Sequence, residues 1–359
     1  MTMSEDAAAW GVSEQAARLH RQAFVADFTL PYTDLGSHAL KRALLPRFAA
    51  NAVDFVSLSI GGDGGLIADT VKIIAQERAR ILQAPDRYAL IATAADMRAA
   101  KAQGRVGLAF DLQGTGPLER SVAMIEVYYV LGVKHMLMAY NTRNEVGDGC
   151  MEPENAGLSA YGRRVVAEMN RVGMLVDCSH TGARTARDVA ELSNAPFIYS
   201  HANIAGVHPH PRNISDEQID ACAQSGGVIG INGISNMLNA DYDISPARVV
   251  EHIDYVVQRV GPDYVGLSLD YVYDQGFIFD IALAAAGGAF PPGSGYKPNM
   301  PLVEPEHFPQ LTQSLLDRGY GEDTVQKILG ENWLRVCEQV WKPVRTSDLA
   351  EALAKDGRP

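Results

Sequence analysis

The sequence has few cysteines, no long apolar run and fewer basic than acidic residues. Its four cysteines show no CxxC spacing, which favours a reducing compartment over a secreted disulfide scaffold. The net charge of −12 argues against a nucleic-acid partner, which would need a basic face. No apolar stretch reaches the ~18 residues that span a bilayer, and the first residues lack the basic and apolar regions of a signal peptide. These absences predict a cytoplasmic protein with neither a nucleic-acid nor a membrane partner.

The composition is that of a folded protein. Apolar residues make up 47% of the 359 positions, so the chain can bury a substantial core. No repeat or low-complexity linker divides it, and we predict one domain over residues 1–359. Residues 12–23 predict an N-terminal helix capped by Ser13, and the chain is expected to be helical again from Glu304 onwards.

Between these ends, short apolar runs alternate with segments rich in helix formers. The eight runs are Phe24–Phe28, Val53–Ser59, Val106–Leu112, Lys134–Tyr140, Met174–Cys178, Phe197–Ser200, Gly227–Ile231 and Tyr264–Leu269. Such alternation is typical of a parallel sheet covered by helices. The count of eight and the chain length predict an α/β fold of the (β/α)8 TIM-barrel type. The Gly- and Pro-rich segment Ala282–Pro301 is interpreted as a surface loop, with a lid over the barrel mouth as the alternative.

The most informative stretch runs from Gly173 to His201. It contains two short apolar runs that each end in Ser-His, at His180 and His201. A strand, a helix and a second parallel strand would bring both histidines to the carboxyl ends of neighbouring strands, where α/β folds carry their chemistry. Neutral histidine is the commonest metal ligand, so the pair indicates a metal site. The alternative is that hydrogen bonds alone satisfy two strand-end histidines.

Polar residues also follow most of the other strands. They include Asp27, Gln113, Tyr140, Asn141 and Asp270. A hydrolytic metal centre needs ligands, an open position for water and a base, and Asp270 is a candidate third ligand or base. Tyr140 and Asn141 could donate hydrogen bonds to a developing oxyanion, with strand-end packing as the alternative.

The loop after the sixth strand carries Arg212. A guanidinium can hold a substrate carboxylate in a bidentate grip, and a surface ion pair is the alternative. His208 and His210 flank prolines in the same loop, and we interpret them as loop residues rather than ligands. Cys178 is interpreted as a core residue.

Several motifs then occur in an order that identifies a family. They begin at Tyr140 (YNTRNEVGDGC), Gly157 (GLSAYGR), Asn170 (NRVGMLVDCSH), Tyr199 (YSH), His210 (HPRNISDE), Val265 (VGLSLD) and Gly330 (GENWLR). From about Phe24 to Val336 the chain resembles the membrane (renal) dipeptidase family of metallopeptidases, peptidase family M19.

The resemblance implies an amidohydrolase-type barrel and zinc-dependent hydrolysis of dipeptides, with two metal ions that share a bridging carboxylate. His180 and His201 match the two ligands of the second metal ion. Asp270 matches the acidic residue that handles the catalytic proton or the substrate amine. Arg212 matches the arginine that binds the free carboxylate of the substrate. Tyr140 stands where many members have a histidine that steadies the tetrahedral intermediate.

The first strand departs from the family pattern. Members end this strand in His-x-Asp, which holds the first metal ion, but residues 25–32 contain no histidine. Aligning on Asp27 puts Thr29 and Pro31 at the ligand positions, whereas aligning on Leu30 and Pro31 puts Asp27 and Thr29 there. Neither register restores the pair.

The bridging glutamate of the family is replaced by Gln113. A neutral amide bridges two metal ions poorly, because it does not neutralise their charge. We therefore expect one zinc ion rather than two, with a metal-free barrel as the alternative. The expected ligands are His180 and His201, completed by Asp270, Gln113, Asp27 or water.

Together these observations predict a metal-dependent hydrolase that uses metal-activated water to cleave the amide bond of a dipeptide or a dipeptide-like small molecule with a free carboxylate. The alternative is a catalytically silent or repurposed family member. It would be a small-molecule binder, or a metal-free lyase or isomerase with Asp27 or Asp270 as its base. We also expect that the barrel can form a homodimer.

Overall fold

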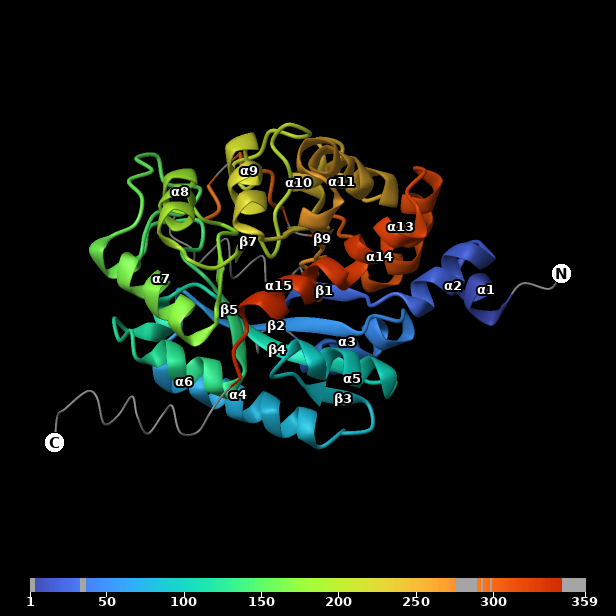
Figure 1. The fold of residues 1–359 in the computed structure, drawn as a ribbon, viewed down its shortest axis with the longest axis horizontal. Coiled ribbons are helices and arrows are strands. Elements are labelled where there is room, and N and C mark those ends of the chain that lie inside the picture. The colour runs from blue at the N-terminus through green and yellow to red at the C-terminus, as the bar shows by residue number, and fades with distance from the viewer. Residues whose placement is uncertain (1–3, 33–36, 275–288, 292, 298, 344–359) are drawn as a thin grey trace.

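Eight parallel strands form the centre of the molecule (Figure 1). The computed structural model describes residues 4–32, 37–274, 289–291, 293–297 and 299–343. The strands are β1 (Ala26–Pro31), β2 (Phe55–Gly62), β4 (Val106–Gln113), β5 (Val133–Leu137), β6 (Leu175–Asp177), β7 (Phe197–Ile198), β8 (Ile229–Ile231) and β9 (Val265–Leu267). The first six pair in parallel in this order, and β8 pairs in parallel with β9.

Two contacts close these strands into a barrel. Tyr199, just after β7, forms a parallel bridge with Ile229 of β8. On the other side, the backbone N–H of Leu269 after β9 donates to Oδ1 of Asp27 in β1 over 3.1 Å. The predicted (β/α)8 fold is therefore confirmed, with its strands in the predicted order. A short strand that the sequence did not predict, β3 (Tyr88–Leu90), pairs with β4 as a branch of the sheet.

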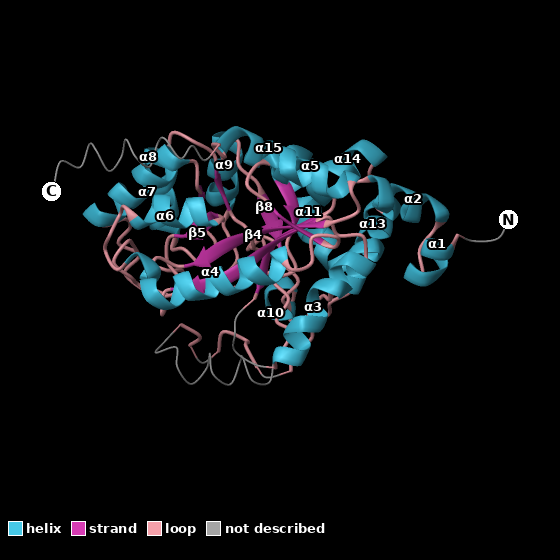
Figure 2. Cartoon of the chain, turned by 90° about the horizontal axis from the view of Figure 1, so that it is seen from below, coloured by secondary structure: helices cyan, strands magenta, loops and turns pink. Residues whose placement is uncertain are grey.

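Helices surround the strands (Figure 2). The helices in the gaps between strands are α3 (His38–Ala50), α4 (Ile67–Leu82), α5 (Ala94–Ala102), α6 (Met124–Leu131), α7 (Ala160–Val172), α8 (Ala183–Leu192), α9 (Asp216–Ser225), α10 (Ser235–Leu238) and α11 (Pro246–Val260). Of these, α3 and α10 were not predicted.

The two ends of the described chain are helical. The N-terminal part forms α1 (Glu5–Trp10), which was not predicted, and α2 (Glu14–Gln22). Ser13 caps α2 as predicted, because its side chain accepts a hydrogen bond from the N–H of Ala16. The C-terminal part forms the expected helices α13 (Phe308–Asp317), α14 (Glu322–Gln326) and α15 (Asn332–Val340).

Aromatic packing closes the amino-terminal end of the barrel. The ring of Phe28 stacks on that of Trp333 in α15, with 4.4 Å between ring centroids, and both are fully buried. Glycine makes room for Phe28, since a Cβ on Gly266 would lie 2.4 Å from its ring. Because this end is filled, polar side chains gather at the other end, where the strands finish.

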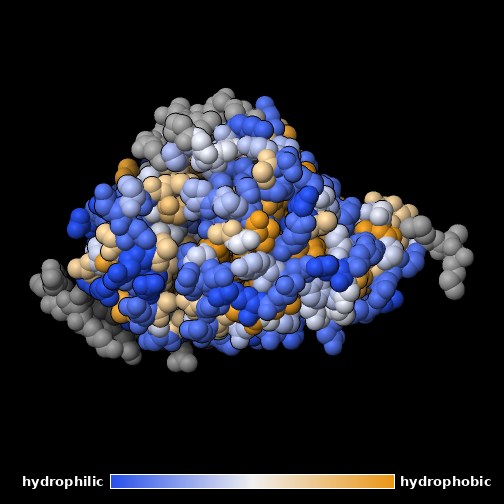
Figure 3. Space-filling model, turned by 90° about the horizontal axis from the view of Figure 1, so that it is seen from above, coloured by the Kyte–Doolittle hydropathy of each residue, from blue (hydrophilic) through white to orange (hydrophobic). Residues whose placement is uncertain are grey.

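The face shown in Figure 3 is mainly hydrophilic, with small, separate apolar areas among the residues that are coloured. In the part of the chain that the structure describes, no helix combines the length and apolarity needed to cross a bilayer.

Candidate active site

Two imidazole rings meet at the carboxyl ends of β6 and β7. The Nε2 atom of His180 lies 2.8 Å from the Nε2 atom of His201. Both side chains are buried, His180 with 4% of its surface exposed and His201 with none. Burial lowers the pKa of each, with the charge of Arg212 as the next cause, and the pKa of His201 falls to about 3. Both rings are therefore neutral, the form that binds a metal ion.

Hydrogen bonds orient both rings. The amide of Asn141 donates from Nδ2 to the carbonyl of Ala289 over 2.8 Å, so its Oδ1 faces His180 Nδ1 at 2.7 Å. An amide oxygen can only accept, so His180 carries its proton on Nδ1 and presents a lone pair at Nε2. The Nδ1 atom of His201 is 2.7 Å from the hydroxyl of Ser200. Hydrogen bonds of this kind from the second ring nitrogen are typical of metal-binding histidines.

The backbone at three of the predicted site residues is left-handed. The φ angles are 60° at Asn141, 60° at His180 and 52° at Asp270. Residues other than glycine seldom adopt this conformation, although Asn, Asp and His do so more often than most. Such strain persists where surrounding contacts fix it, and it concentrates at functional sites.

Inside the barrel, on the amino-terminal side of the two histidines, lies a buried ion-pair network. His135 of β5 lies between two carboxylates, with its Nδ1 3.2 Å from Asp177 and its Nε2 3.6 Å from Asp111. Ser57 and Ser59 donate their hydroxyls to Asp111 over 2.8 and 2.6 Å. Burial alone would lower the pKa of His135, but the two carboxylates raise it above its ordinary value. His135 was not predicted from the sequence, because it lies inside β5 and not at the carboxyl end of the strand.

Asp177 connects this network to the two histidines. Its Oδ1 accepts the backbone N–H groups of Ser179 and Ser200 over 3.0 and 3.1 Å. These serines directly precede His180 and His201. Although burial raises the pKa of Asp177, its bond to the ring of His135 brings the value down to about 2. The carboxylate of Asp177 thus connects the end of β6, which precedes His180, to the end of β7, which precedes His201.

Tyr140 and Arg212 lie against the histidine pair. The ring of Tyr140 stacks on that of His180, with centroids 3.9 Å apart. Arg212 is 2% exposed and donates from Nη2 to the carbonyl of His201 over 3.0 Å. Within the described chain, its buried Nε has no hydrogen-bond partner. A buried cation with a spare donor is suited to a ligand that brings a carboxylate.

Asp270 belongs to the same cluster. Burial raises the pKa of Asp270 to about 7, while the charge of Arg212 pulls it down. The negative charge of Asp270 in turn raises the pKa of Tyr140, for which burial is the larger cause. The phenol of Tyr140 consequently stays protonated and can donate a hydrogen bond.

His210 has a role that the sequence did not reveal. Its Nδ1 accepts the backbone N–H of Arg212 over 3.1 Å, and its Nε2 lies 2.8 Å from the carbonyl of Ser294. It therefore links the arginine loop to the described part of the segment Ala282–Pro301. Phe290 in that segment also packs edge-on against Tyr140, with ring centroids 6.1 Å apart. The described part of the segment thus contacts the site.

The two remaining predicted ligands make no hydrogen bond to the histidines, and within the described chain the buried Oδ2 of Asp27 has no hydrogen-bond partner. Gln113 donates from Nε2 to Ser59 over 3.1 Å. Asp27 is fully buried, and burial raises its pKa to about 8. The register of β1 against β2 shifts between Asp27 and Leu30, so β1 has one extra residue in the segment Phe28–Thr29 that follows Asp27. Among the described residues, neither Asp27 nor Gln113 is hydrogen-bonded to either histidine.

The donor set can be compared with what a metal ion needs. Two neutral imidazoles with converging Nε2 atoms fit as ligands of one ion. In the described ranges, no group of three His, Cys, Asp or Glu side chains is spaced to hold a metal ion. Among the described residues, the structure therefore offers a metal ion the two histidines, with no third group of this kind spaced to join them.

Asp63 is a further residue that sequence reasoning missed. Its Oδ2 accepts the backbone N–H of Tyr140 over 2.9 Å, and its Oδ1 accepts that of Thr115 over 2.7 Å. Asn144 donates to the same carboxylate. The only sequence signal is its position in Gly-Gly-Asp-Gly-Gly, which reads as a turn. Asp63 fixes the backbone from which Tyr140 projects.

A cavity of about 350 Å³ borders this cluster. His180, Arg212 and Cys150 are among the residues that line it. Cys178 also borders it but belongs to the hydrophobic core, as predicted, and burial raises the pKa of its thiol. A small molecule in this cavity would contact the histidine and the guanidinium at the same time.

Comparison with known families agrees with this arrangement. The family model for membrane dipeptidase (peptidase family M19) matches residues 52–279 and 281–350. The chain therefore belongs to that family, as its motifs predicted. The dipeptidase verJ of Clonostachys rogersoniana is 31% identical over 71% of this chain and 61% of its own length. The dipeptidase aclJ of Aspergillus oryzae is 32% identical over 71% of this chain and 57% of its own length. The match thus spans about three-fifths of these relatives.

Solved structures show the same fold. An amidohydrolase from Pseudomonas aeruginosa superimposes with a TM-score of 0.80 and 33% identity, covering 91% of this chain and 99% of that one. A metallopeptidase from Rhodobacter sphaeroides, liganded with a phosphinate mimic of the dipeptide L-Ala-D-Ala, gives a TM-score of 0.72 at 22% identity, covering 89% and 99%. At that identity the second likeness concerns the fold alone.

Proposed function

We propose that the chain is a hydrolase of dipeptides, or of dipeptide-like amides with a free carboxylate, and that it uses one zinc ion bound by His180 and His201. The observation that carries the proposal is the pair of facing Nε2 atoms, 2.8 Å apart, beside the buried guanidinium of Arg212. Family membership supports the same reaction class. The four cysteines, all free thiols, support a cytoplasmic location as part of the proposal.

The side chains around the histidines have chemistry that suits amide hydrolysis. Zinc held by histidines supplies acidified water at neutral pH. Arg212 binds the free carboxylate of the substrate and so fixes its orientation. Asp270, with a pKa raised to about 7 by burial, can accept a proton and return it to the leaving amine near neutrality. The protonated phenol of Tyr140 donates to the oxyanion, with Asn141 holding the neighbouring ring of His180.

Dipeptide hydrolysis by the purified chain, with and without added zinc, tests the proposal. We expect hydrolysis that depends on zinc and falls at least about 100-fold in His180→Ala and in His201→Ala, since mutating even the partners of metal ligands costs about 10–100-fold. His208→Ala, in a nearby loop, is the matched histidine control and should keep the parent rate. Equal rates in the parent and in both histidine variants would exclude this mechanism.

A second candidate function is binding without hydrolysis. The neutral Gln113 and the lack of a third ligand within the described ranges favour it. Calorimetry would then detect dipeptide binding that depends on Arg212, while mass spectrometry finds no product with any metal. A product of unchanged mass would instead indicate an isomerase. Two products whose masses sum to that of the dipeptide plus one water would exclude both alternatives.

A further inference from the structure

His210 holds the main chain of Arg212 in a turn. The N–H of Asn213 donates to the carbonyl of His210 over 2.9 Å, which makes residues 210–213 a β-turn. Pro211 lies at its second position, where its fixed φ favours the turn and where no N–H needs an acceptor. The next N–H, that of Arg212, donates to Nδ1 of His210 over 3.1 Å. The side chain of His210 thus takes the part that asparagine plays in an Asx turn, and it fixes the main chain from which Arg212 projects.

The second ring nitrogen of His210 connects this turn to a distant part of the chain. Burial lowers the pKa of His210 to about 4, so the ring is neutral and carries one proton. Because Nδ1 accepts the N–H of Arg212, that proton is on Nε2, which donates to the carbonyl of Ser294 over 2.8 Å. The same carbonyl accepts Nδ2 of Asn236 over 3.0 Å, and the ring of Tyr296 packs edge-on against that of His210. Both nitrogens of His210 are therefore engaged, and its ring is held in one orientation.

The surroundings of Arg212 explain why its main chain needs to be held. The residue is buried, and within the described chain it forms no ion pair. Its Nη2 donates to the carbonyl of His201 over 3.0 Å, while its Nε has no hydrogen-bond partner among the described residues. A buried charge without a counter-ion is costly, and a long side chain on a loop can carry its charged end to water if the main chain moves. The two hydrogen bonds of His210 oppose that movement.

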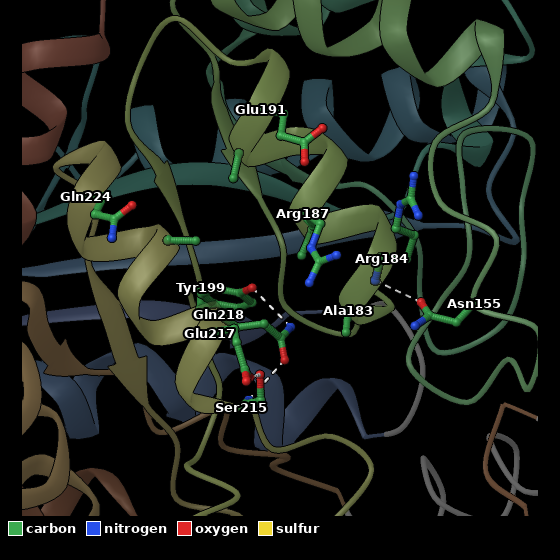
Figure 4. Close-up of a pocket in the computed structure, with 13 residues that line it drawn as sticks. Asn155, Ala183, Arg184, Arg187, Glu191, Tyr199, Ser215, Glu217, Gln218 and Gln224 are labelled. Carbon is green, nitrogen blue, oxygen red and sulfur yellow. Dashed lines mark hydrogen bonds between the residues drawn. The ribbon is translucent and has the colours of Figure 1, made fainter.

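His210 and Arg212 border the same cavity. Both line the space of about 350 Å³ that also borders His180. A larger space of about 550 Å³ between α8 and α9 is lined by other side chains, among them Arg187 and Glu191 (Figure 4), and not by His210 or Arg212. A ligand in the smaller cavity would therefore lie beside both the guanidinium and the histidine that holds its main chain.

We propose that His210 is a positioning residue for recognition of the substrate carboxylate. It holds the main chain of Arg212 through Nδ1 and anchors that turn to Ser294 through Nε2, so the guanidinium is oriented before the substrate binds. A preorganised donor loses less freedom on binding, which raises affinity for a ligand with a carboxylate and not for the matching amide. The inference rests on the proposed function, because that function assigns the free carboxylate of the substrate to Arg212.

Calorimetry on the full, zinc-loaded chain tests this role with a probe that cannot be cleaved. The probe is the reduced analogue of Ala-Ala, in which CH2–NH replaces the amide, and its C-terminal amide is the matched ligand without a carboxylate. We expect the parent to bind the acid about tenfold more tightly than the amide. His210→Ala removes both hydrogen bonds and should lower affinity for the acid about tenfold, with the affinity for the amide unchanged. His210→Asn keeps an acceptor for the N–H of Arg212 but is too short to reach Ser294, so it should lower affinity for the acid about threefold.

Two controls separate positioning from a general loss of structure. Asn236→Ala removes the other donor to the carbonyl of Ser294 but leaves both hydrogen bonds of His210, so it should retain the parent's preference for the acid. Zinc titration should give His210→Ala the affinity of the parent, because neither hydrogen bond of His210 involves His180 or His201. If a thermal melt shows that His210→Ala does not fold, His210→Asn takes its place in the same comparisons.

The outcomes separate this role from the proposed reaction. A preference for the acid that survives in the His210 variant overturns the role, as does an equal loss in Asn236→Ala or a matching fall in zinc affinity. A parent that does not distinguish acid from amide overturns it as well, together with the assignment of the carboxylate to Arg212. If the preference depends on His210 but Ala-Ala is not cleaved with zinc, the positioning role stands and the hydrolase proposal fails. If Ala-Ala is cleaved and the preference does not depend on His210, the reaction stands and the positioning role fails.

Discussion

The Nε2 atoms of His180 and His201 face each other at 2.8 Å, and Asn141 holds the proton of His180 on the opposite nitrogen. His180 therefore directs a lone pair at its partner. A proton on Nε2 of His201 satisfies that lone pair in the free protein. A metal ion would be held by both Nε2 atoms once that proton is on Nδ1 of His201, where the hydroxyl oxygen of Ser200, 2.7 Å away, can accept it. The tautomer of His180 thus links a local amide contact to metal affinity.

The first prediction concerns the hydrogen bond between Asn141 and His180. Asn141→Leu removes the acceptor for Nδ1–H of His180 and frees the ring, so we expect zinc affinity to fall about 10–100-fold. Asn141→Asp keeps an acceptor oxygen and should retain most of the affinity. Zinc titration by calorimetry measures both. Unchanged affinity in Asn141→Leu would show that the contact does not orient the ligand.

Substrate recognition by Arg212 gives the second prediction. Arg212→Lys retains the charge but loses the bidentate geometry, so KM for a dipeptide should rise about tenfold or more with a smaller change in kcat. An amidated dipeptide, which lacks the carboxylate, should be equally poor for the parent and the variant. If the variant affects both substrates alike, Arg212 does not bind that carboxylate.

The buried network of Asp111, His135 and Asp177 gives the third prediction. His135→Gln leaves two carboxylates without their cation, and breaking a buried pair in this way costs about 3–5 kcal/mol of unfolding free energy. The exposed pair of Arg120 and Glu145, 3.0 Å apart, is the matched control, since Arg120→Gln should cost at most about 1 kcal/mol. Urea unfolding measures both. If His135→Gln loses as little unfolding free energy as Arg120→Gln, the network of Asp111, His135 and Asp177 adds little stability.

Two buried histidines outside the site give the fourth prediction, on acid stability. Burial lowers the pKa of His20 and of His252 to about 4, against an ordinary value of 6.5. His252 accepts the N–H of Ile204 on Nδ1 over 3.0 Å, a bond that protonation would break. Because the folded pKa is the lower one, each neutral ring contributes its stability above pH 6.5, and that contribution is lost as the pH falls toward 4.

The fourth prediction is measured by thermal unfolding between pH 7 and pH 4. The loss should be of order 3 kcal/mol for each histidine. His252→Gln lowers stability at pH 7, but its unfolding should depend less steeply on pH than that of the parent. A variant with the parent's pH dependence would exclude His252 as a cause.

The barrel could be predicted because each of its eight strands has its own apolar run and most gaps have a helix-like segment. The elements that were missed have weak local signals. Pro46 lies inside α3 and argues against a helix, and β3 has only three residues.

The candidate site was predictable where its residues follow strands in recognisable motifs, as at His180 and His201. The role of His135 was not predictable, because its partners Asp111 and Asp177 come from two other strands. Asp63 contacts Tyr140 across 77 positions of sequence, and its flanking glycines suggest only a turn. Contacts of this kind follow from how strands align in the closed barrel, which local sequence does not encode.

The left-handed backbone at Asn141, His180 and Asp270 limits which residues these positions can accept. A β-branched side chain at any of the three would oppose the local main chain before its chemistry mattered. Glycine would relieve that strain, but it would also leave a cavity where a buried side chain now packs, and at Asn141 and His180 it would leave hydrogen-bond partners unpaired. Few substitutions at these three positions therefore satisfy both the main chain and the packing around it, whatever reaction the site carries out.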